Sequence, residues 1–572
     1  MPSPQPPDAA FPDAASELVA TLADEGVRHL FINPGTDTAP VQEALAAARV
    51  GGLPAPRAVL CTHEFVALSA AMGHHFASGT PQAVMVHVDA GTLNLGGAVH
   101  NAQRNQVPVV VFAGRAPYAT EADVPGHRDR PIHWQQEQLD QQATLRAYGK
   151  WAMEVPRGRE MGRIVRRAFQ VARSEPRGLG YVMLPREALM EPPGAASRRL
   201  TVPRPAAPDP AGLADAARCL ADAARPVVVT GRTGARPEAV TALAELAELL
   251  GCPVLDQRDR VNFPPGHPLW AAGETALLRE ADVVLVLDAE VPWIPAVAAP
   301  PPTATVLQID LDCVKVTMPS WAYPVDLALT ADSSLALPLL TAELRGLAGP
   351  DRVQRWRARG QELAGRLDRL RERWAEAARS AEPADAADAM LAALNRALPP
   401  EAIVCEEAVT NRPAVTRQIT RDPDHLYSSG APSLGWALPG AMGVRLARPD
   451  APVVAVCGDG SFNFSVPTAA IWSAQRAGAP FLAVILDNHA YRASRLPVQQ
   501  LFPAGAAEAE GRFPETDLSP APDYLQLARA YGGDGEVVRD PKEMAGAVER
   551  GLALVETGRC AVLDVELPRP GS

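Results

Sequence analysis

The segment VVAVCGDGSFNFSVPTAAIWSAQRAGAPFLAVILDNHAYRA, residues Val453–Ala493, is the most informative part of the chain. Its first residues are apolar and predict a buried β-strand, which ends at the turn Gly458-Asp459-Gly460-Ser461. A helix is expected next, and then a second buried strand, Phe481–Leu486, which ends at Asp487-Asn488. In an open α/β sheet, ligands bind where the carboxyl ends of parallel strands meet. The segment therefore predicts a ligand site between the turn and Asn488.

The turn and the second strand end offer the groups that bind a metal-bound diphosphate. Gly458 and Gly460 lack a Cβ, so the backbone there can approach a phosphate closely, and Ser461 completes the turn. Free N–H groups at the start of the following helix favour an anion. Asp459 and Asn488 carry hard oxygen ligands, which Mg²⁺ prefers together with phosphate oxygens. A Gly-Asp-Gly turn alone is common, so the prediction depends on its place between a strand and a helix.

Apolar runs that alternate with helical patterns recur along the chain. Those that predict strands are Ala83–His87, Val109–Ala113, Pro226–Thr230, Val283–Asp288, Thr305–Ile309, Val453–Cys457 and Phe481–Leu486. Continuous apolar strands separated by amphipathic helices are typical of parallel sheets that are covered on both faces. We therefore predict α/β units at residues 10–190, 200–345 and 385–572, with a helical linker at 346–384.

Composition excludes several classes of protein. The 572-residue chain has a net charge of −12 and no basic block, so we expect no nucleic-acid partner. No apolar run reaches the roughly 18 to 20 residues of a membrane helix, and the first residues do not resemble a signal peptide, so no membrane association is expected. The seven cysteines are scattered without a CxxC pair, which favours a cytoplasmic location.

The first unit contains HLFINPGTDTAPVQEAL from His29 and CTHEFVALSAAMGHHFASGT from Cys61. Together with Val453–Ala493, these stretches resemble the thiamine-diphosphate-dependent enzymes of acetolactate synthase and pyruvate decarboxylase type, and most closely the benzoylformate decarboxylases. The resemblance implies an α/β fold of three doubly wound parallel-sheet domains: pyrimidine-binding, central and diphosphate-binding. It also implies thiamine diphosphate and Mg²⁺ as cofactors.

The resemblance assigns the activating carboxylate and the metal ligands. Glu64 matches the carboxylate that hydrogen-bonds the pyrimidine N1′ of the cofactor and so promotes removal of the proton from thiazolium C2. The metal ligands would be the Asp459 carboxylate, the Asn488 amide oxygen and the backbone carbonyl of Ala490. Gly458, Gly460 and Ser461 would surround the diphosphate.

Further residues of the first unit correspond to the substrate side of the site. His87 falls on a histidine that handles protons in benzoylformate decarboxylases, although a buried core histidine is the alternative. Thr36 falls where those enzymes have a serine that contacts the substrate carboxylate. The pair His74-His75 lies at a helix end, where helix capping is the better interpretation.

The third unit supplies the surface beneath the cofactor, with some departures from the family pattern. The carbonyl of Pro432 would accept a hydrogen bond from the 4′-amino group, and Leu434 matches the apolar residue that holds the cofactor bent. Asp487 stands where relatives have Asn. Pro295 and Ser494 stand where related decarboxylases carry a second His and a Glu, respectively, which favours carboligation over simple protonation.

The sequence therefore predicts decarboxylation of a small 2-oxo acid, carboligation with a second carbonyl such as an aldehyde, or both. The alternatives are an acetolactate-synthase-like transferase, an acyloin lyase and a non-catalytic scaffold of the same fold. The presence of Glu64, Asp459 and Asn488 argues against the scaffold. The resemblance also implies a homodimer at minimum and usually a homotetramer, because related enzymes build the cofactor site from domains of two subunits.

Overall fold

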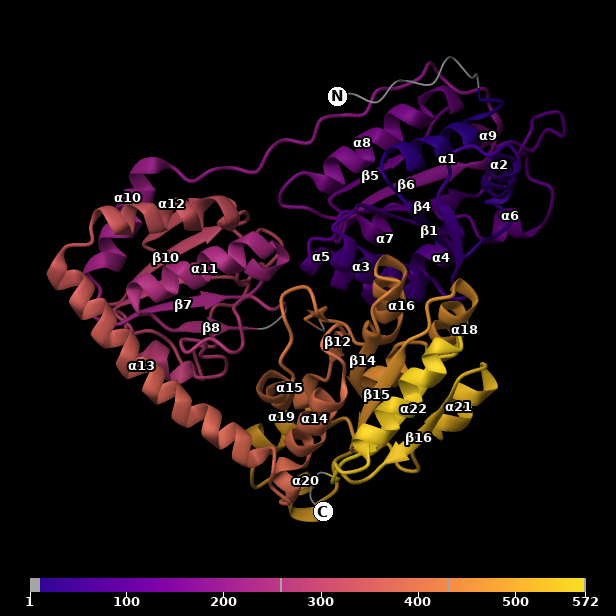
Figure 1. Cartoon of the computed structure of the whole chain (residues 1–572). Coiled ribbons are helices and arrows are strands. Elements are labelled where there is room, and N and C mark those ends of the chain that lie inside the picture. The colour runs from indigo at the N-terminus through magenta and orange to yellow at the C-terminus, as the bar shows by residue number, and fades with distance from the viewer. Residues whose placement is uncertain (1–10, 258–259, 431, 570–572) are drawn as a thin grey trace.

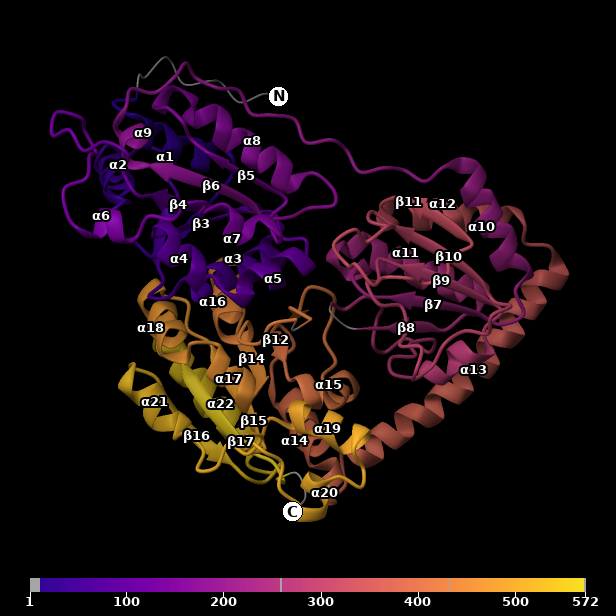
Figure 2. The ribbon, with the colours of Figure 1, turned by 180° about the vertical axis from the view of Figure 1, so that it is seen from behind.

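The computed structural model describes residues 11–257, 260–430 and 432–569. Three domains, each built on one parallel sheet, form the corners of a triangle (Figure 1). A long connection leads from the N-terminal domain to α10 (Pro210–Asp222) of the central domain. Helix α13 (Pro350–Ala377) then runs along the outer edge to the C-terminal domain, as both views show (Figures 1 and 2). The predicted α/β fold with three parallel-sheet domains is confirmed. Residue 10 and residues 570–572, which we assigned to the first and last units, lie outside the described residues.

The N-terminal domain has six parallel strands in the order β2-β1-β3-β4-β6-β5. Alternate residues of β4 point to opposite faces: Val109 and Val111 join the core beneath α3, whereas Val110 and Phe112 join the core beneath α1 and α8. The elements are α1 (Ala14–Asp24), β1 (His29–Ile32), α2 (Ala39–Val50), β2 (Arg57–Leu60), α3 (Glu64–Ser78), β3 (Gln82–Val86), α4 (Val88–Asn94), α5 (Gly97–Arg104), β4 (Val109–Arg115), α6 (Ile132–Gln135), α7 (Ala143–Arg146), β5 (Trp151–Glu154), α8 (Met161–Arg173), β6 (Gly180–Pro185) and α9 (Arg186–Met190).

The C-terminal domain repeats this topology, with the strand order β13-β12-β14-β15-β17-β16. Counted from the first strand of each domain, both sheets read 2-1-3-4-6-5. The elements are α14 (Ala386–Ala397), β12 (Ile403–Glu407), α15 (Arg412–Gln418), β13 (Leu426–Ser428), α16 (Ala437–Ala447), β14 (Val453–Gly458), α17 (Asp459–Phe464), α18 (Pro467–Ala477), β15 (Leu482–Asp487), α19 (Arg492–Leu501), α20 (Ala506–Glu510), α21 (Tyr524–Ala530), β16 (Asp534–Val538), α22 (Met544–Glu556) and β17 (Ala561–Glu566).

The central domain has five parallel strands in the order β11-β10-β9-β7-β8. Its elements besides α10 are β7 (Pro226–Thr230), α11 (Pro237–Leu250), β8 (Val254–Asp256), β9 (Val283–Leu287), β10 (Thr305–Asp310), β11 (Leu327–Thr330) and α12 (Ser333–Gly346). The predicted strand Pro226–Thr230 matches β7, and the other predicted strands are present with ends that differ by one or two residues. Among the described residues, no helix is both long and apolar enough to cross a membrane.

One hydrophobic core joins the N-terminal and C-terminal domains. It contains residues of α3 and α5 from the first domain and of α16 and α18 from the last. Helices α3 and α16 cross at Gly73 and Gly440, where a Cβ on Gly73 would lie 2.0 Å from the Gly440 carbonyl oxygen. A Cβ on Gly443 would likewise lie 1.9 Å from the carbonyl oxygen of Ala70. Glycine thus allows the two backbones to touch and holds the domains against each other.

Candidate active site

Three neighbouring strands of the N-terminal sheet place the predicted catalytic residues. Strands β2, β1 and β3 lie side by side and run in the same direction, so their carboxyl ends meet at one edge. Thr36 follows β1, Glu64 follows β2 and begins α3, and His87 follows β3 directly. The structure therefore brings Thr36, Glu64 and His87 to the same edge of the sheet.

Two amide side chains hold the Glu64 carboxylate. Asn33 donates a hydrogen bond of 3.0 Å to Oε1, and Asn94 donates one of 3.2 Å to Oε2. Glu64 is only 4% exposed. A Cβ on Gly91 would lie 3.0 Å from Oε1, so this side of the carboxylate is closely packed. The carboxylate is thus fixed at the first residue of α3, in a buried position where it can hydrogen-bond a ligand.

His87 is paired with a carboxylate that the sequence analysis did not single out. Its Nδ1 lies 2.5 Å from Oδ1 of Asp37, which is 3% exposed. This hydrogen bond raises the pKa of His87 above its ordinary value, and burial opposes the shift. The next residue, Val88, has φ +32, which is unusual for a β-branched residue, and its N–H points to Oδ2 of Asp37 at 3.3 Å. His87 is therefore oriented by a buried carboxylate and is not simply packed in the hydrophobic core.

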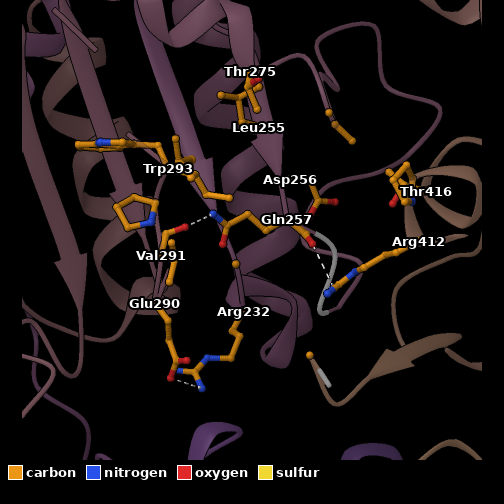
Figure 3. Close-up of a pocket in the computed structure, with 18 of the residues that line it drawn as sticks. Arg232, Leu255, Asp256, Gln257, Thr275, Glu290, Val291, Trp293, Arg412 and Thr416 are labelled. Carbon is orange, nitrogen blue, oxygen red and sulfur yellow. Dashed lines mark hydrogen bonds and ion pairs between the residues drawn. The ribbon is translucent and has the colours of Figure 1, made fainter. Parts of the chain in front are cut away.

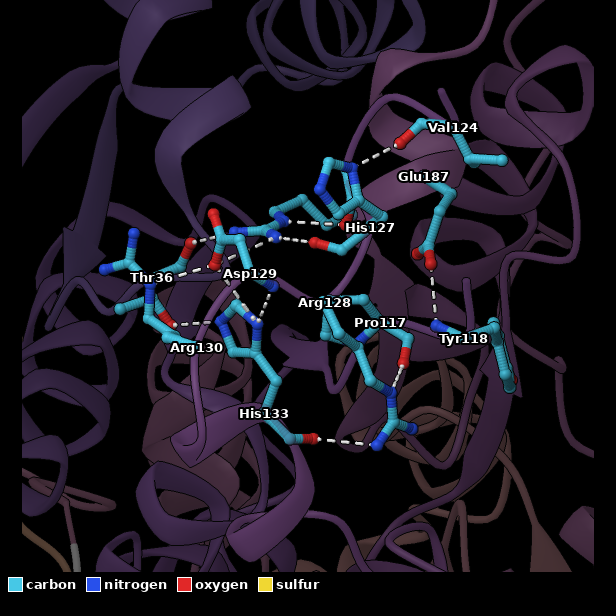
Figure 4. A network of polar contacts seen from close by, with 12 residues as sticks. Thr36, Pro117, Tyr118, Val124, His127, Arg128, Asp129, Arg130, His133 and Glu187 are labelled. Carbon is cyan, nitrogen blue, oxygen red and sulfur yellow. Dashed lines mark hydrogen bonds and ion pairs between the residues drawn. The ribbon is translucent and has the colours of Figure 1, made fainter. Parts of the chain in front are cut away.

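The segment between β4 and β5 contacts Thr36 through a polar network (Figure 4). Nε2 of His133 lies 3.4 Å from the Thr36 hydroxyl oxygen, and Arg186 donates a 3.4 Å hydrogen bond to the Thr36 carbonyl. Arg186 also donates a hydrogen bond of 2.9 Å to the carbonyl of Gly126. The Asp129 carboxylate lies 3.7 Å from the Arg186 guanidinium. The network fastens this segment over the end of β1.

In the C-terminal domain, Asp459, Asn488 and Ala490 lie together, but the Ala490 carbonyl, the third predicted ligand, accepts a hydrogen bond from the Arg492 N–H at 2.8 Å. Asp459 begins α17 and accepts hydrogen bonds from the backbone N–H groups of Gly460 at 2.8 Å and Ala490 at 3.1 Å. The same Ala490 N–H lies 3.0 Å from Oδ1 of Asn488. The carboxylate and the amide oxygen thus meet at one point. Gly458 precedes α17, and Ser461 lies in its first turn. The helix expected after the turn is divided at Ser465-Val466 into α17 and α18.

The donor chemistry at this point fits a hard divalent cation. Burial, followed by a hydrogen bond with Asp487, raises the pKa of Asp459 to about 7. Nδ1 of His489 lies 3.5 Å from Oδ2 of Asp487, and neither atom forms a hydrogen bond among the described residues. Two buried carboxyl groups and an amide oxygen are costly to bury without a cation or proton, and they match the ligands of Mg²⁺. Among the described residues no group of three His, Cys, Asp or Glu side chains is arranged for a metal, so a metal here would also need carbonyl, amide or phosphate oxygens.

The segment Pro432–Leu434 connects the two halves of the site. The Asn101 side chain of α5 donates to the Ser433 carbonyl at 2.9 Å and accepts from the Ser433 N–H at 3.0 Å. A Cβ on Gly97 would lie 1.7 Å from the Ser433 hydroxyl oxygen, so the loop lies directly on the start of α5. This start is three residues after Asn94, which contacts Glu64. Pro432 and Leu434 therefore lie next to the Glu64 side of the site.

A second contact fixes the other side of the same junction. The Thr62 N–H donates to the hydroxyl oxygen of Ser473 in α18 at 3.4 Å, and Arg57 donates to the carbonyl of Ala477 at 2.7 Å. The N-terminal and C-terminal halves thus face each other within a single chain. The family resemblance implies that the two halves of each site come from different subunits, and this sharing stays a prediction.

Glu407 supports the loop that carries Leu434. Its carboxylate, at the end of β12, accepts hydrogen bonds from the backbone N–H groups of Gly435, Trp436 and Ala437 at 3.0 to 3.2 Å. Burial nevertheless raises the pKa of Glu407 to about 8. Glu407 was not identified from the sequence, although its place at a strand end of the same sheet edge was a usable signal.

A large cavity of about 1030 Å³ opens where the three domains meet (Figure 3). His100 lines it from the N-terminal domain, Arg232 and Trp293 from the central domain, and Arg412 and Pro432 from the C-terminal domain. Trp293 is 6% exposed and packs edge-to-face on Tyr323, so it serves both the core and the cavity wall. Because Pro432 forms part of the wall, the cavity borders the Pro432–Leu434 segment.

The histidine pair at the end of α3 does not take part in the site. His74 is 1% exposed and contacts His29 through ring nitrogens 3.0 Å apart. His75 lies 2.9 Å from the Thr80 carbonyl, and the Gly79 N–H closes the helix on the His75 carbonyl. The pair stands at the opposite end of α3 from Glu64, where its contacts are local and structural.

Comparisons with known proteins agree with this arrangement. Residues 12–144, 213–340 and 410–565 match the N-terminal, central and C-terminal domain families of thiamine pyrophosphate enzymes. Benzoylformate decarboxylase of Pseudomonas aeruginosa is 28% identical over 93% of this chain and 95% of its own. The large subunit of acetolactate synthase isozyme 2 of Escherichia coli is 26% identical over 94% and 93%.

The fold has counterparts among solved structures. The crystal structure of benzoylformate decarboxylase from Polynucleobacter necessarius superposes with a TM-score of 0.76, at 21% identity, over 97% of this chain and 99% of that one. All three domain families are present in the order that the sheets show, and together they cover most of the chain. The chain belongs to the thiamine-diphosphate-dependent enzymes of the decarboxylase and acetolactate synthase type.

Proposed function

We propose that this protein is a thiamine-diphosphate- and Mg²⁺-dependent enzyme that decarboxylates a 2-oxo acid and can join the product carbon to a second carbonyl. One observation carries the proposal. The edge of the N-terminal sheet that holds Glu64 and His87 lies against the Pro432–Leu434 segment of the domain that holds Asp459. A carboxylate, a protonatable imidazole and a metal-binding carboxylate are the side-chain groups that such chemistry requires.

Each cofactor contact has a candidate residue in this chain. When bound, thiamine diphosphate supplies a nucleophilic carbon and an acceptor for the electron pair that CO₂ leaves behind. Asp459, Asn488 and the Ala490 carbonyl would hold Mg²⁺, and the backbone of Gly458, Gly460 and Ser461 would receive the diphosphate. Glu64, fixed by its two amide donors, would share a proton with the pyrimidine ring. Pro432 and Leu434 would support the cofactor from below.

The substrate side follows from the same geometry. The Thr36 hydroxyl and the His87 imidazole stand at the sheet edge beside Glu64, so a carboxylate-bearing substrate could be oriented by the first and receive a proton from the second. The cavity beside Pro432 would admit the substrate, and Trp293 and Arg232 form part of its wall. Pro295 and Ser494 provide no second acid, which favours attack on another carbonyl over simple protonation.

A panel of 2-oxo acids, aliphatic and aromatic, tests this proposal. With thiamine diphosphate and Mg²⁺ present, CO₂ release and the organic products are measured together. We expect CO₂ with an aldehyde, an acyloin or both, depending on whether an acceptor aldehyde is added. An acyloin cleaved or formed without CO₂ would identify a lyase, and cofactor binding without any turnover would identify a scaffold. Either result would contradict the proposal.

We also propose that the enzyme assembles as a homodimer at minimum, and as a homotetramer if two dimers associate. Leu93, which precedes the Asn94 that donates a hydrogen bond to Glu64, is 59% exposed. Phe464, the last residue of α17, is 53% exposed. Large apolar side chains exposed beside a buried site favour a covering partner. Light scattering on the purified protein should give at least twice the 60.6 kDa of one chain. A monomer at micromolar concentration would contradict the assembly.

A further inference from the structure

The contact between Asp37 and His87 is built into the fold rather than formed at its surface. Asp37 lies in the connection between β1 and α2, and its side chain is 1% exposed, whereas the His87 side chain is 24% exposed. One carboxylate oxygen lies 2.5 Å from Nδ1 of His87, and the other lies 3.3 Å from the Val88 N–H. The carboxylate therefore touches both the ring of His87 and the backbone that follows it.

Two glycines leave the space that the pair occupies. A Cβ on Gly35 would lie 1.9 Å from Nδ1 of His87, and a Cβ on Gly114 would lie 1.6 Å from Oδ2 of Asp37. Neither glycine has a positive φ. Their lack of a side chain thus serves the close packing of this pair and not a left-handed backbone. The left-handed φ of Val88 is a third local feature that keeps the His87 ring beside the carboxylate.

We propose that Asp37 is the positioning residue of the active site. Its carboxylate contacts Nδ1 of His87 and so fixes the orientation of the ring. Nε2 is then the ring nitrogen that exchanges a proton with the substrate. The negative charge of Asp37 stabilises the protonated ring between turnovers. The inference rests on the function proposed above and deepens it. In each turnover the proton would leave Nε2 for the carbon from which CO₂ has departed, and the ring would regain a proton from water.

The charges around the ring agree with this role. Asp37 from the β1 connection and Glu64 from the start of α3 are the charged groups that face His87, and both favour the protonated ring. Burial, with a smaller contribution from the charge of Asp37, raises the pKa of Tyr181 of β6 to about 12, so its hydroxyl stays neutral. The neutral side chain of Gln136 also faces the ring and raises the pKa of His87, but the contact with Asp37 is the largest influence on the imidazole.

The variant Asp37→Asn tests the proposal. The amide keeps the size of the side chain but removes its charge, so the ring should lose its proton at lower pH. Product formation at neutral pH should fall about 10²-fold, and the basic limb of the kcat profile should move to lower pH. Thiamine diphosphate binding and exchange of its C2 proton should stay unchanged. Asp89→Asn removes another buried carboxylate, two residues after His87 and outside the pair, and should have none of these effects. An unaltered kcat profile in Asp37→Asn would overturn the proposal.

A direct measurement on the unmodified enzyme separates this proposal from the proposed reaction. The ring signal of His87 can be followed by NMR in protein with ¹³C-labelled histidine and assigned by its loss in His87→Gln. We expect this ring to titrate above the ordinary value of 6.5. Titration at or below that value would show that Asp37 does not hold the proton, whatever the substrate panel gives. A raised value with no CO₂ release from any 2-oxo acid would leave the pair intact and reject only the reaction.

Discussion

Gly73 of α3 and Gly440 of α16 touch where the N-terminal and C-terminal domains meet, with space for no Cβ between them. Glu64 begins α3, and α16 follows the loop that carries Leu434. The crossing of these two helices therefore sets the distance between the candidate pyrimidine and thiazolium sides of the site.

The first prediction concerns this crossing. Gly73→Ala would place a methyl group 2.0 Å from a carbonyl oxygen, so the helices must separate. We expect a loss of about 1–3 kcal/mol or more in the free energy of unfolding and weaker binding of thiamine diphosphate. Gly365→Ala in α13 is the matched control, since a Cβ there meets nothing within 4 Å. This control should be neutral or stabilising by up to about 1 kcal/mol. The free energy of unfolding in denaturant and the affinity for thiamine diphosphate are measured for both variants. Equal values for Gly73→Ala and Gly365→Ala would refute the role of the crossing.

A second prediction concerns the metal. Asp459→Ala removes the carboxylate that meets Asn488 at the Ala490 N–H, so Mg²⁺-dependent binding of thiamine diphosphate should be lost. Asp450→Ala removes an exposed carboxylate before the other end of β14 and should bind normally. Calorimetric titration with and without Mg²⁺ measures both. Cofactor binding to Asp459→Ala that is as tight as in the unmodified enzyme would contradict the assignment.

A third prediction concerns acid stability. Burial lowers the pKa of His74 from 6.5 to about 3, so the ring is neutral in the folded protein over the whole physiological range. Because the unfolded chain binds a proton below pH 6.5, stability is fully present above that pH and is lost as the pH falls toward 3. The melting temperature should therefore drop between about pH 7 and about pH 5, and less steeply in His74→Gln. An identical pH dependence in both proteins would show that His74 is not the buried neutral group.

The sequence was sufficient for the fold because its strands are apolar on both faces. Pro226–Thr230 and Val453–Cys457 could be located without knowledge of their neighbours, and the polar residues that follow each strand had to share a sheet edge. Asp459 could be singled out for the same reason, whereas Glu64 and His87 were singled out by the family resemblance. Their roles in catalysis remain predictions, which the experiments above address.

The sequence did not reveal which side chains pair across strand ends. Asp37 stands next to Thr36, and only the three-dimensional register shows that its carboxylate meets His87 fifty residues later. Asn33 and Asn94, which hold Glu64, are ordinary turn residues in the sequence. His133 lies in the four-residue helix α6, which is too short to show a helical period, so its contact with Thr36 was not predictable. Such contacts depend on the packing of distant segments.

The measurement that tests the central claim most directly is proton exchange at C2 of bound thiamine diphosphate. Hydrogen–deuterium exchange is followed by quenched-flow NMR in the unmodified enzyme and in Glu64→Gln, each saturated with cofactor and Mg²⁺. Gln keeps the size of the side chain and its contact with Asn33, but an amide cannot share a proton with the pyrimidine ring. We expect exchange at least about 10²-fold slower in Glu64→Gln, with the cofactor still bound. Equal exchange rates in the two proteins would contradict this expectation.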